Sequence, residues 1–156
     1  NERRVLQARA LAALGRTEHA LELVAYDQGP EADRLRADIA WDGRNWSEAG
    51  RLMEALLGDR WRDDRPLGAA EAHDVLRALI AYALVQDEPG MDRIVARYGQ
   101  AMSQTEHAAA FNTVANRSVA PGDSRLSALV GQIANVQRSD ALMAGFGQYD
   151  EAGPES

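Results

Sequence analysis

Apolar side chains recur every three or four residues along most of the chain, which is the spacing of one face of an α-helix. Glycine, proline and capping residues interrupt this rhythm and mark where helices end and begin. β-Branched residues are sparse and no alternating run is bounded by hairpin signals, so we expect an all-α fold. The pattern predicts helices at 5–14, from Thr17 to the turn at Gln28–Pro30, and at 30–41, 46–57, 67–86, 90–100, 105–117 and 124–137, with a short helix at 140–146.

Small residues also recur in a fixed arrangement. A small residue is followed three positions later by another small or apolar one, nine positions after that by a small one, and after four more by a large apolar one. Small side chains at such positions allow two antiparallel helices to approach closely. The three occurrences are Ala8, Leu11, Ala20 and Val24, then Ala37, Ala40, Ala49 and Met53, and more loosely Ala78, Ala81, Gly90 and Ile94.

This arrangement resembles the tetratricopeptide repeat (TPR), a 34-residue unit of two antiparallel helices built around small residues. The match is clearest in residues 1–60, where Gly15 also stands at a turn position and Asn45 and Trp46 open the second helix of a unit. The units are spaced 29 and then 41 residues apart, and the tryptophan of the family's first helix is missing. The chain therefore resembles a divergent member of the family.

The resemblance implies a right-handed α-α superhelix of about four antiparallel helix pairs, with 124–137 as a C-terminal capping helix. It also implies that a ligand binds on the concave face, which residues of the first helices line. Carried over position by position, these residues are Val5, Arg9, Ala12 and Ala13, then Arg34, Asp38, Trp41 and Asp42, then Val75, Leu79, Tyr82 and Ala83.

Within that face, we expect the partner to contact Arg9, Arg34, Asp38, Trp41 and Tyr82. Arginine, tryptophan and tyrosine are enriched in the hot spots of interfaces. The alternative is that Trp41 and Tyr82 pack between neighbouring hairpins.

A polar stretch from Asp59 to Pro66 is the longest interruption of the apolar rhythm and predicts an inserted loop. Trp61 in this loop is either an anchor for a partner or is packed over the preceding helix. The Asp63–Asp64 pair could bind a cation, but arginines on both sides favour neutralisation.

The chain is long enough for one domain with a real core, which we expect to cover 1–152, with a frayed tail at 153–156. It begins at Asn1, already in a helical pattern. We therefore expect a piece of a longer protein. All 17 basic residues are arginine, and alanine is abundant. This bias indicates a GC-rich bacterial genome.

The charge pattern argues against two classes of partner. The formal net charge is -7, so a nucleic acid would be repelled. Charged residues interrupt the chain well before the roughly 18 apolar residues that a membrane span needs. We expect a soluble segment of the cytoplasm or periplasm, between which the sequence does not decide.

Residues that could carry chemistry are not arranged in known motifs. His19, His73 and His107 are far apart in sequence, and none has a spacing that places two metal ligands on one helix face. Cysteine is absent, and so are the serine-hydrolase, phosphate-loop and dinucleotide signatures. We expect no enzyme, cofactor or metal, although a site assembled from distant residues stays open.

These observations favour a protein–protein interaction or assembly scaffold that binds a protein or peptide on its concave surface. The alternative is a structural end-cap, or a dimerisation domain that forms a homodimer through an amphipathic face.

Overall fold

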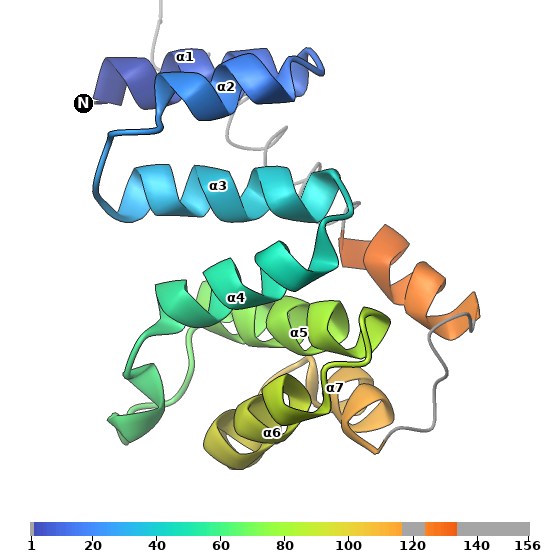
Figure 1. Ribbon diagram of the computed structural model, residues 1–156. Coiled ribbons are helices and arrows are strands. Elements are labelled where there is room, and N and C mark those ends of the chain that lie inside the picture. The colour runs from blue at the N-terminus through green and yellow to red at the C-terminus, as the bar shows by residue number, and fades with distance from the viewer. Residues whose placement is uncertain (1, 117–123, 134–156) are drawn as a thin grey trace, which may run out of the picture. The chain divides into compact units, whose positions relative to one another are not determined.

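The computed structural model describes residues 2–116 and 124–133, and every regular element among them is a helix (Figure 1). The chain divides into two compact units, Asn1–Pro121 and Gly122–Ser156. The first unit holds α1 (Glu2–Ala13), α2 (Thr17–Leu23), α3 (Pro30–Asp42), α4 (Trp46–Leu57), the short 3₁₀ helix η1 (Arg60–Arg62), α5 (Ala69–Leu84), α6 (Glu88–Met102) and α7 (Ala108–Ala115).

In the second unit, residues 124–133 form one helix. The rest of the predicted capping helix, the predicted helix at 140–146 and the tail at 153–156 lie outside the described residues. The all-α class is confirmed for the part of the chain that is described. No helix in that part combines the length and the apolar character needed to cross a membrane.

Helix ends follow local backbone chemistry. α3 begins at Pro30, whose fixed φ suits a first helical position, directly after Gly29 at a φ of 135° that glycine readily adopts. α6 begins at Glu88 and not at residue 90, because the Asp87 carboxylate accepts a hydrogen bond from the Gly90 amide at 3.0 Å and caps the helix.

Three predicted helices are shorter than expected. α5 spans Ala69–Leu84 and not 67–86. α2 ends at Leu23 and not at the turn before Pro30. α7 begins at Ala108 and not at Thr105, because the Thr105 hydroxyl donates to the Met102 carbonyl at 2.8 Å and accepts from the His107 amide, which places it in the turn after α6.

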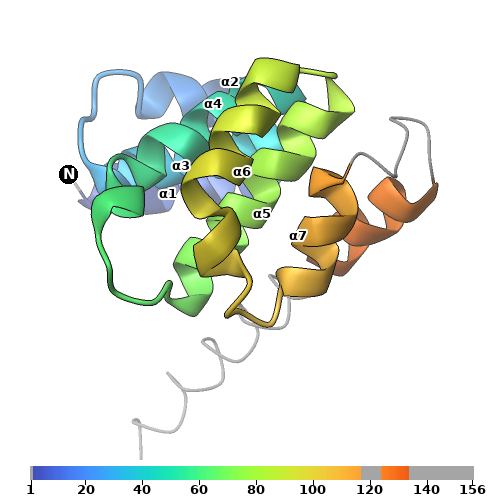
Figure 2. The ribbon, with the colours of Figure 1, turned by 90° about the horizontal axis from the view of Figure 1, so that it is seen from below.

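Most consecutive helices of the first unit pack against one another (Figures 1 and 2). α1 packs on α2, α3 on α4, and α5 on both α4 and α6. α1 also contacts α3, and α7 contacts α5 and α6. The helices therefore form antiparallel hairpins whose neighbours touch in order along the chain.

The recurring small residues lie where these helices meet. Eleven of the twelve positions in the three occurrences are buried. Leu11, the exception, is partly buried and packs against a core cluster that includes Ala8, Ala20 and Val24. Fully enclosed members include Ala8, Ala20, Ala37, Ala49 and Ala78, each at 0% exposure. The prediction that these residues line close helix contacts is thus confirmed by their burial.

Tyr82 on α5 shows how close the helices come. A Cβ atom added to Gly90 on α6 would lie 2.7 Å from the Tyr82 ring, and one added to Gly50 on α4 would lie 3.0 Å from it. Real Cβ atoms essentially never approach a carbon below 3.0 Å. The ring therefore occupies space that two glycines on different helices leave free.

We expect Gly90→Ala to lower the free energy of unfolding by about 1–3 kcal/mol, because the new methyl group overlaps a ring that neighbouring helices hold in place. Gly99→Ala in the same helix is the matched control, since its Cβ would have neighbours no closer than 3.9 Å. That change should raise the stability by up to about 1 kcal/mol through helix propensity. Urea unfolding measures both, and equal effects of the two substitutions would contradict the packing argument.

Candidate functional site

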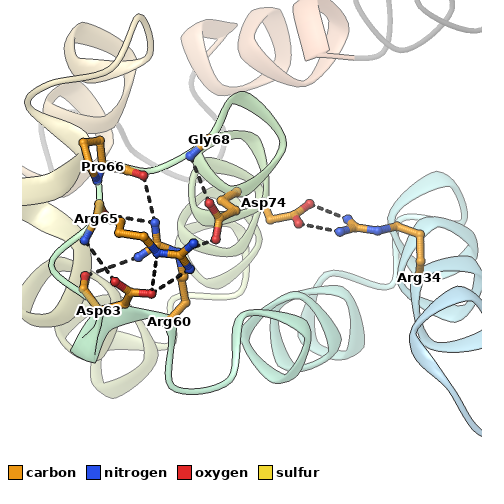
Figure 3. Close-up of polar contacts among 8 residues, drawn as sticks. Arg34, Arg60, Asp63, Arg65, Pro66, Gly68 and Asp74 are labelled. Carbon is orange, nitrogen blue, oxygen red and sulfur yellow. Dashed lines mark hydrogen bonds and ion pairs between the residues drawn. The ribbon is translucent and has the colours of Figure 1, made fainter.

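A polar cluster joins α3 to α5 and contains three of the predicted contact residues. Arg34 on α3 donates two hydrogen bonds to the carboxylate of Asp74 on α5, at 2.5 and 2.6 Å (Figure 3). Asp74 is buried, whereas about a third of the Arg34 side chain is exposed. The hydrogen bonds to Asp74 raise the pKa of Arg34, although burial opposes this. Such a two-pronged pair fixes the helices in register as well as in distance.

Arg77 lies deeper in the same cluster. It is 1% exposed, and it donates two hydrogen bonds at 3.1 Å to one oxygen of Asp38 on α3. Its guanidinium also lies 4.9 Å from the ring centre of Trp41, which is a cation–π contact. Burial lowers the pKa of Arg77, and the carboxylate of Asp38 counteracts this. The Nε atom of Arg77 has no hydrogen-bond partner.

A second cluster surrounds Glu54 on α4. Its carboxylate accepts a hydrogen bond from the Tyr82 hydroxyl at 2.6 Å and two from the Arg93 guanidinium at 2.9 and 3.1 Å. Arg97 lies 3.8 Å away. Burial alone would raise the pKa of Glu54, but the hydrogen bonds from Arg93 and Tyr82 and the charges of both arginines lower it overall. Glu54 thereby connects α4, α5 and α6.

The predicted loop at 59–66 is held by Arg60. The Arg60 guanidinium donates to the Glu71 carboxylate and to the carbonyl oxygens of Asp63, Arg65 and Pro66 (Figure 3). Asp63 pairs with Arg65 at 2.7 Å, and hydrogen bonds from Arg65 lower the pKa of Asp63 to about 2. For Asp63, the expected neutralisation by a flanking arginine is confirmed.

Trp61 in this loop is half-buried and lies beside α6. The guanidinium groups of Arg62 and Arg97 are 4.8 and 5.1 Å from its ring centre. Its indole Nε1 is buried without a hydrogen-bond partner. The ring is therefore engaged with arginines of its own chain, and its role as an anchor for a partner stays a prediction.

The five predicted contact residues do not form one open surface. Arg34, Asp38 and Trp41 belong to the α3–α5 cluster, while Tyr82 belongs to the cluster around Glu54. Trp41 and Tyr82 are 3% and 4% exposed, so the packing alternative describes both residues in this structure. Arg9 on α1 is exposed. Contact with a partner stays a prediction for Arg9, Arg34 and Asp38.

One pairing of residues was not evident in the sequence. His73 on α5 and His107, the N-cap of α7, lie with their ring centres 6.1 Å apart although 34 positions separate them. The sequence Thr-Glu-His-Ala surrounds both His19 and His107, and it does not indicate that His107 lies near His73. Among the residues that the structure describes, no group of three or more histidine and acidic side chains could hold a metal ion.

Exposed apolar side chains gather on the first hairpin. Of the five large hydrophobic residues that the described chain leaves exposed, four belong to α1, α2 or the segments that follow them: Leu6, Leu14, Leu21 and Tyr26. A pocket of about 240 Å³ lies beside this hairpin, between α2, α3 and α4, and Leu21, Ile39 and Leu52 supply its apolar lining.

Comparison of the chain with models of known families, with curated proteins and with solved structures gave no match. The resemblance to TPR proteins therefore rests on the residue pattern described above.

We expect Asp74→Asn to lower the free energy of unfolding by about 1–3 kcal/mol, because it leaves the positive charges of Arg34 and Arg77 without this buried carboxylate. The expected cost is below the roughly 3–5 kcal/mol of a fully buried pair, since Arg34 is partly solvated. Asp33→Asn is the matched control, because Asp33 is exposed and pairs with Arg36 on the same helix. Its cost should stay below about 1 kcal/mol in the same urea titration. Equal costs would show that the α3–α5 pair is not a structural contact.

The cluster around Glu54 predicts a pH dependence. Because the pKa of Glu54 is lower in the folded than in the unfolded protein, the unfolded state binds more protons in that interval. Its contribution to stability is complete above the ordinary pKa of 4.5 and is lost as the pH falls through the folded-state value. Urea titrations from about pH 6 to about pH 3 should show a shallower decline for Glu54→Gln than for the native protein. The exposed Glu22→Gln variant should keep the native decline, and an unchanged slope in Glu54→Gln would refute the assignment.

Proposed function

We propose that this chain is a non-catalytic docking module that binds a polypeptide partner on a helical surface. The architecture that supports the proposal is a succession of antiparallel hairpins whose small residues are buried at the contacts. We further propose that the hairpins stack as a right-handed, TPR-like superhelix. A stack of this kind presents long, rigid helical surfaces, which suits the recognition of other polypeptides.

The observation that carries the proposal is an apolar stripe on α1. Leu6, Ala10 and Ala13 follow one another at intervals of four and three residues, and all three are exposed. Val5 and Ala8, which are buried, lie on the other side of the helix. Leu14 extends the stripe just after the helix and is 77% exposed. A helix with apolar residues on both sides offers one of them to a partner.

The stripe has the features of a helix-docking surface. The two alanines in its middle permit close approach, and leucines at 63% and 77% exposure flank them. Arg9 on the same helix is also exposed and can add a charged contact at the edge. In this proposal the partner contacts α1, where apolar side chains are free, and not the α3–α5 cluster, where charged side chains are already paired.

The proposal is tested with helical peptides selected from a displayed amphipathic library against the 156-residue chain. We expect the double variant Leu6→Ser with Leu14→Ser to weaken binding of the selected peptides by about 10–100-fold. The reason is that the apolar surface that each leucine buries on docking contributes about 1.5 kcal/mol or less to the free energy of binding. Titration by fluorescence polarisation measures the change. Both side chains are exposed, so the free energy of unfolding of the variant should lie within about 0.5 kcal/mol of that of the native protein.

Val85→Ser is the matched control, because Val85 is an exposed apolar residue outside the first hairpin. It should leave the affinity unchanged. Failure to select any peptide whose binding depends on Leu6 and Leu14 would overturn the proposal. The stripe would also suit a homodimer through α1, which is a different face from that of 124–137, where the sequence placed the alternative of dimerisation. A mass that rises with concentration and returns to that of a monomer in the double variant, without peptide binding, would establish the homodimer through α1 instead.

A further inference from the structure

We infer that His73 and His107 form a pH-sensitive contact between α5 and α7, which weakens when the His73 imidazole gains a proton in mildly acidic solution. The inference concerns the stability of one helix contact and is independent of the proposed partner. It rests on the position of the two rings, on the charges around them and on the helix end at which His107 lies.

The two imidazoles face one another across the α5–α7 contact. Their ring centres are 6.1 Å apart and their planes are tilted by 43°. His73 is partly buried, and its Nε2 atom is enclosed without a hydrogen-bond partner. A neutral imidazole can leave that nitrogen unprotonated. A protonated imidazole carries a hydrogen on both nitrogens, so protonation would place an unsatisfied donor and a charge in this enclosed position.

The surrounding charges oppose a proton on His73. Arg77 on the same helix and Arg34 on α3 are both positive, and His107 would add a third charge if protonated. Asp74 is the negative group on this side, but it is already bonded to Arg34. Burial, followed by Arg77, lowers the pKa of His73. Arg77 itself is paired with Asp38 of α3, which leaves the local balance of charge close to neutral only while His73 is uncharged.

The position of His107 adds an independent reason. It is the N-cap of α7, so the positive end of the α7 dipole lies beside His73 and disfavours a proton on that ring. Glu106 is the nearest acid, with its carboxylate 3.7 Å from the His107 ring, but its side chain is 78% exposed and solvent screens it. α7 itself, from Ala108 to Ala115, contains no titratable side chain.

The direction of the pH effect follows from linkage. When α7 separates from α5, His73 becomes hydrated and its pKa returns towards the ordinary value of 6.5. The open state then binds more protons than the closed state between the lowered pKa of the closed state and about 6.5, so the closed state is progressively lost as the pH falls through that interval. Above that interval both states are neutral and the contact keeps its full strength. One proton of difference changes the open population by about tenfold per pH unit.

Hydrogen exchange of the full chain, followed by NMR, tests the inference between about pH 7.5 and about pH 5.5, the interval in which histidine titrates. The Phe111 amide reports on α7, because it donates to the His107 carbonyl at 2.9 Å. The Ala49 amide, which donates to the Asn45 carbonyl in α4, is the internal reference. We expect protection at Phe111, corrected for the intrinsic exchange rate, to fall by up to about tenfold per pH unit while protection at Ala49 stays constant.

Two variants make the result specific. His107→Asn should reduce the loss of protection at Phe111 in acid and should raise the pKa of His73, read from its ring signals. His19→Asn is the matched control, because His19 is exposed on α2, and it should behave like the native chain. His107 is itself partly exposed, so the first variant should fold. Constant protection at Phe111, an equal loss at Ala49, or identical profiles for the native chain and His107→Asn would each overturn the inference.

Discussion

The packing of this protein depends on side chains small enough for helix backbones to come close together. Alanines recur among the buried residues of the helices, and Ala8, Ala20, Ala37, Ala49 and Ala78 are fully enclosed. Where a large ring does enter, as Tyr82 does, glycines on α4 and α6 leave the space for it. The contacts of Tyr82 are therefore specified by volume, and a methyl group added at Gly90 is enough to disturb them.

Close approach determines where charged groups can be tolerated. Arg77 and Asp74 lie on the side of α5 that faces α3, in positions with almost no access to water. An arginine in that setting needs compensation, which Asp38 and the Trp41 ring supply. Replacement of buried ion pairs by apolar side chains is often neutral or stabilising in proteins. We therefore expect the main contribution of this cluster to be the register of α5 against α3, which these side-chain pairs link.

The sequence predicted local features well because they depend on local chemistry. The bounds of α3 and α4 follow from Pro30, Gly43, Asn45 and Gly58, each of which acts on its own backbone. The burial of the small residues follows from their spacing. The predicted start of α6 at residue 90 was wrong. Pro89 and Gly90 were interpreted as a turn, whereas they lie in the first turn of a helix that Asp87 caps.

Contacts between distant segments were beyond the sequence pattern. Tryptophan is a residue type that is enriched in interface hot spots, which is why the sequence singled out Trp41. Only the three-dimensional structure shows Arg77 lying against its ring. His73 and His107 lie close together because α7 packs against α5. The spacing of apolar residues in the sequence does not show that these two helices are in contact. Residue type alone therefore identified side chains that could bind a partner, but it did not show whether they already contact other residues of their own chain.

That distinction bears on the docking surface that we propose. A charged or aromatic side chain that is paired within its own chain must lose that pairing before it contacts another molecule, and the cost of the loss is subtracted from the affinity. Arg34, Asp38, Trp41 and Tyr82 all carry this cost. The apolar stripe on α1 carries none, because Leu6 and Leu14 release only water when they are covered. Under the proposed function, docking therefore gains more free energy at the exposed leucines of the first hairpin than at side chains that are already paired within the chain.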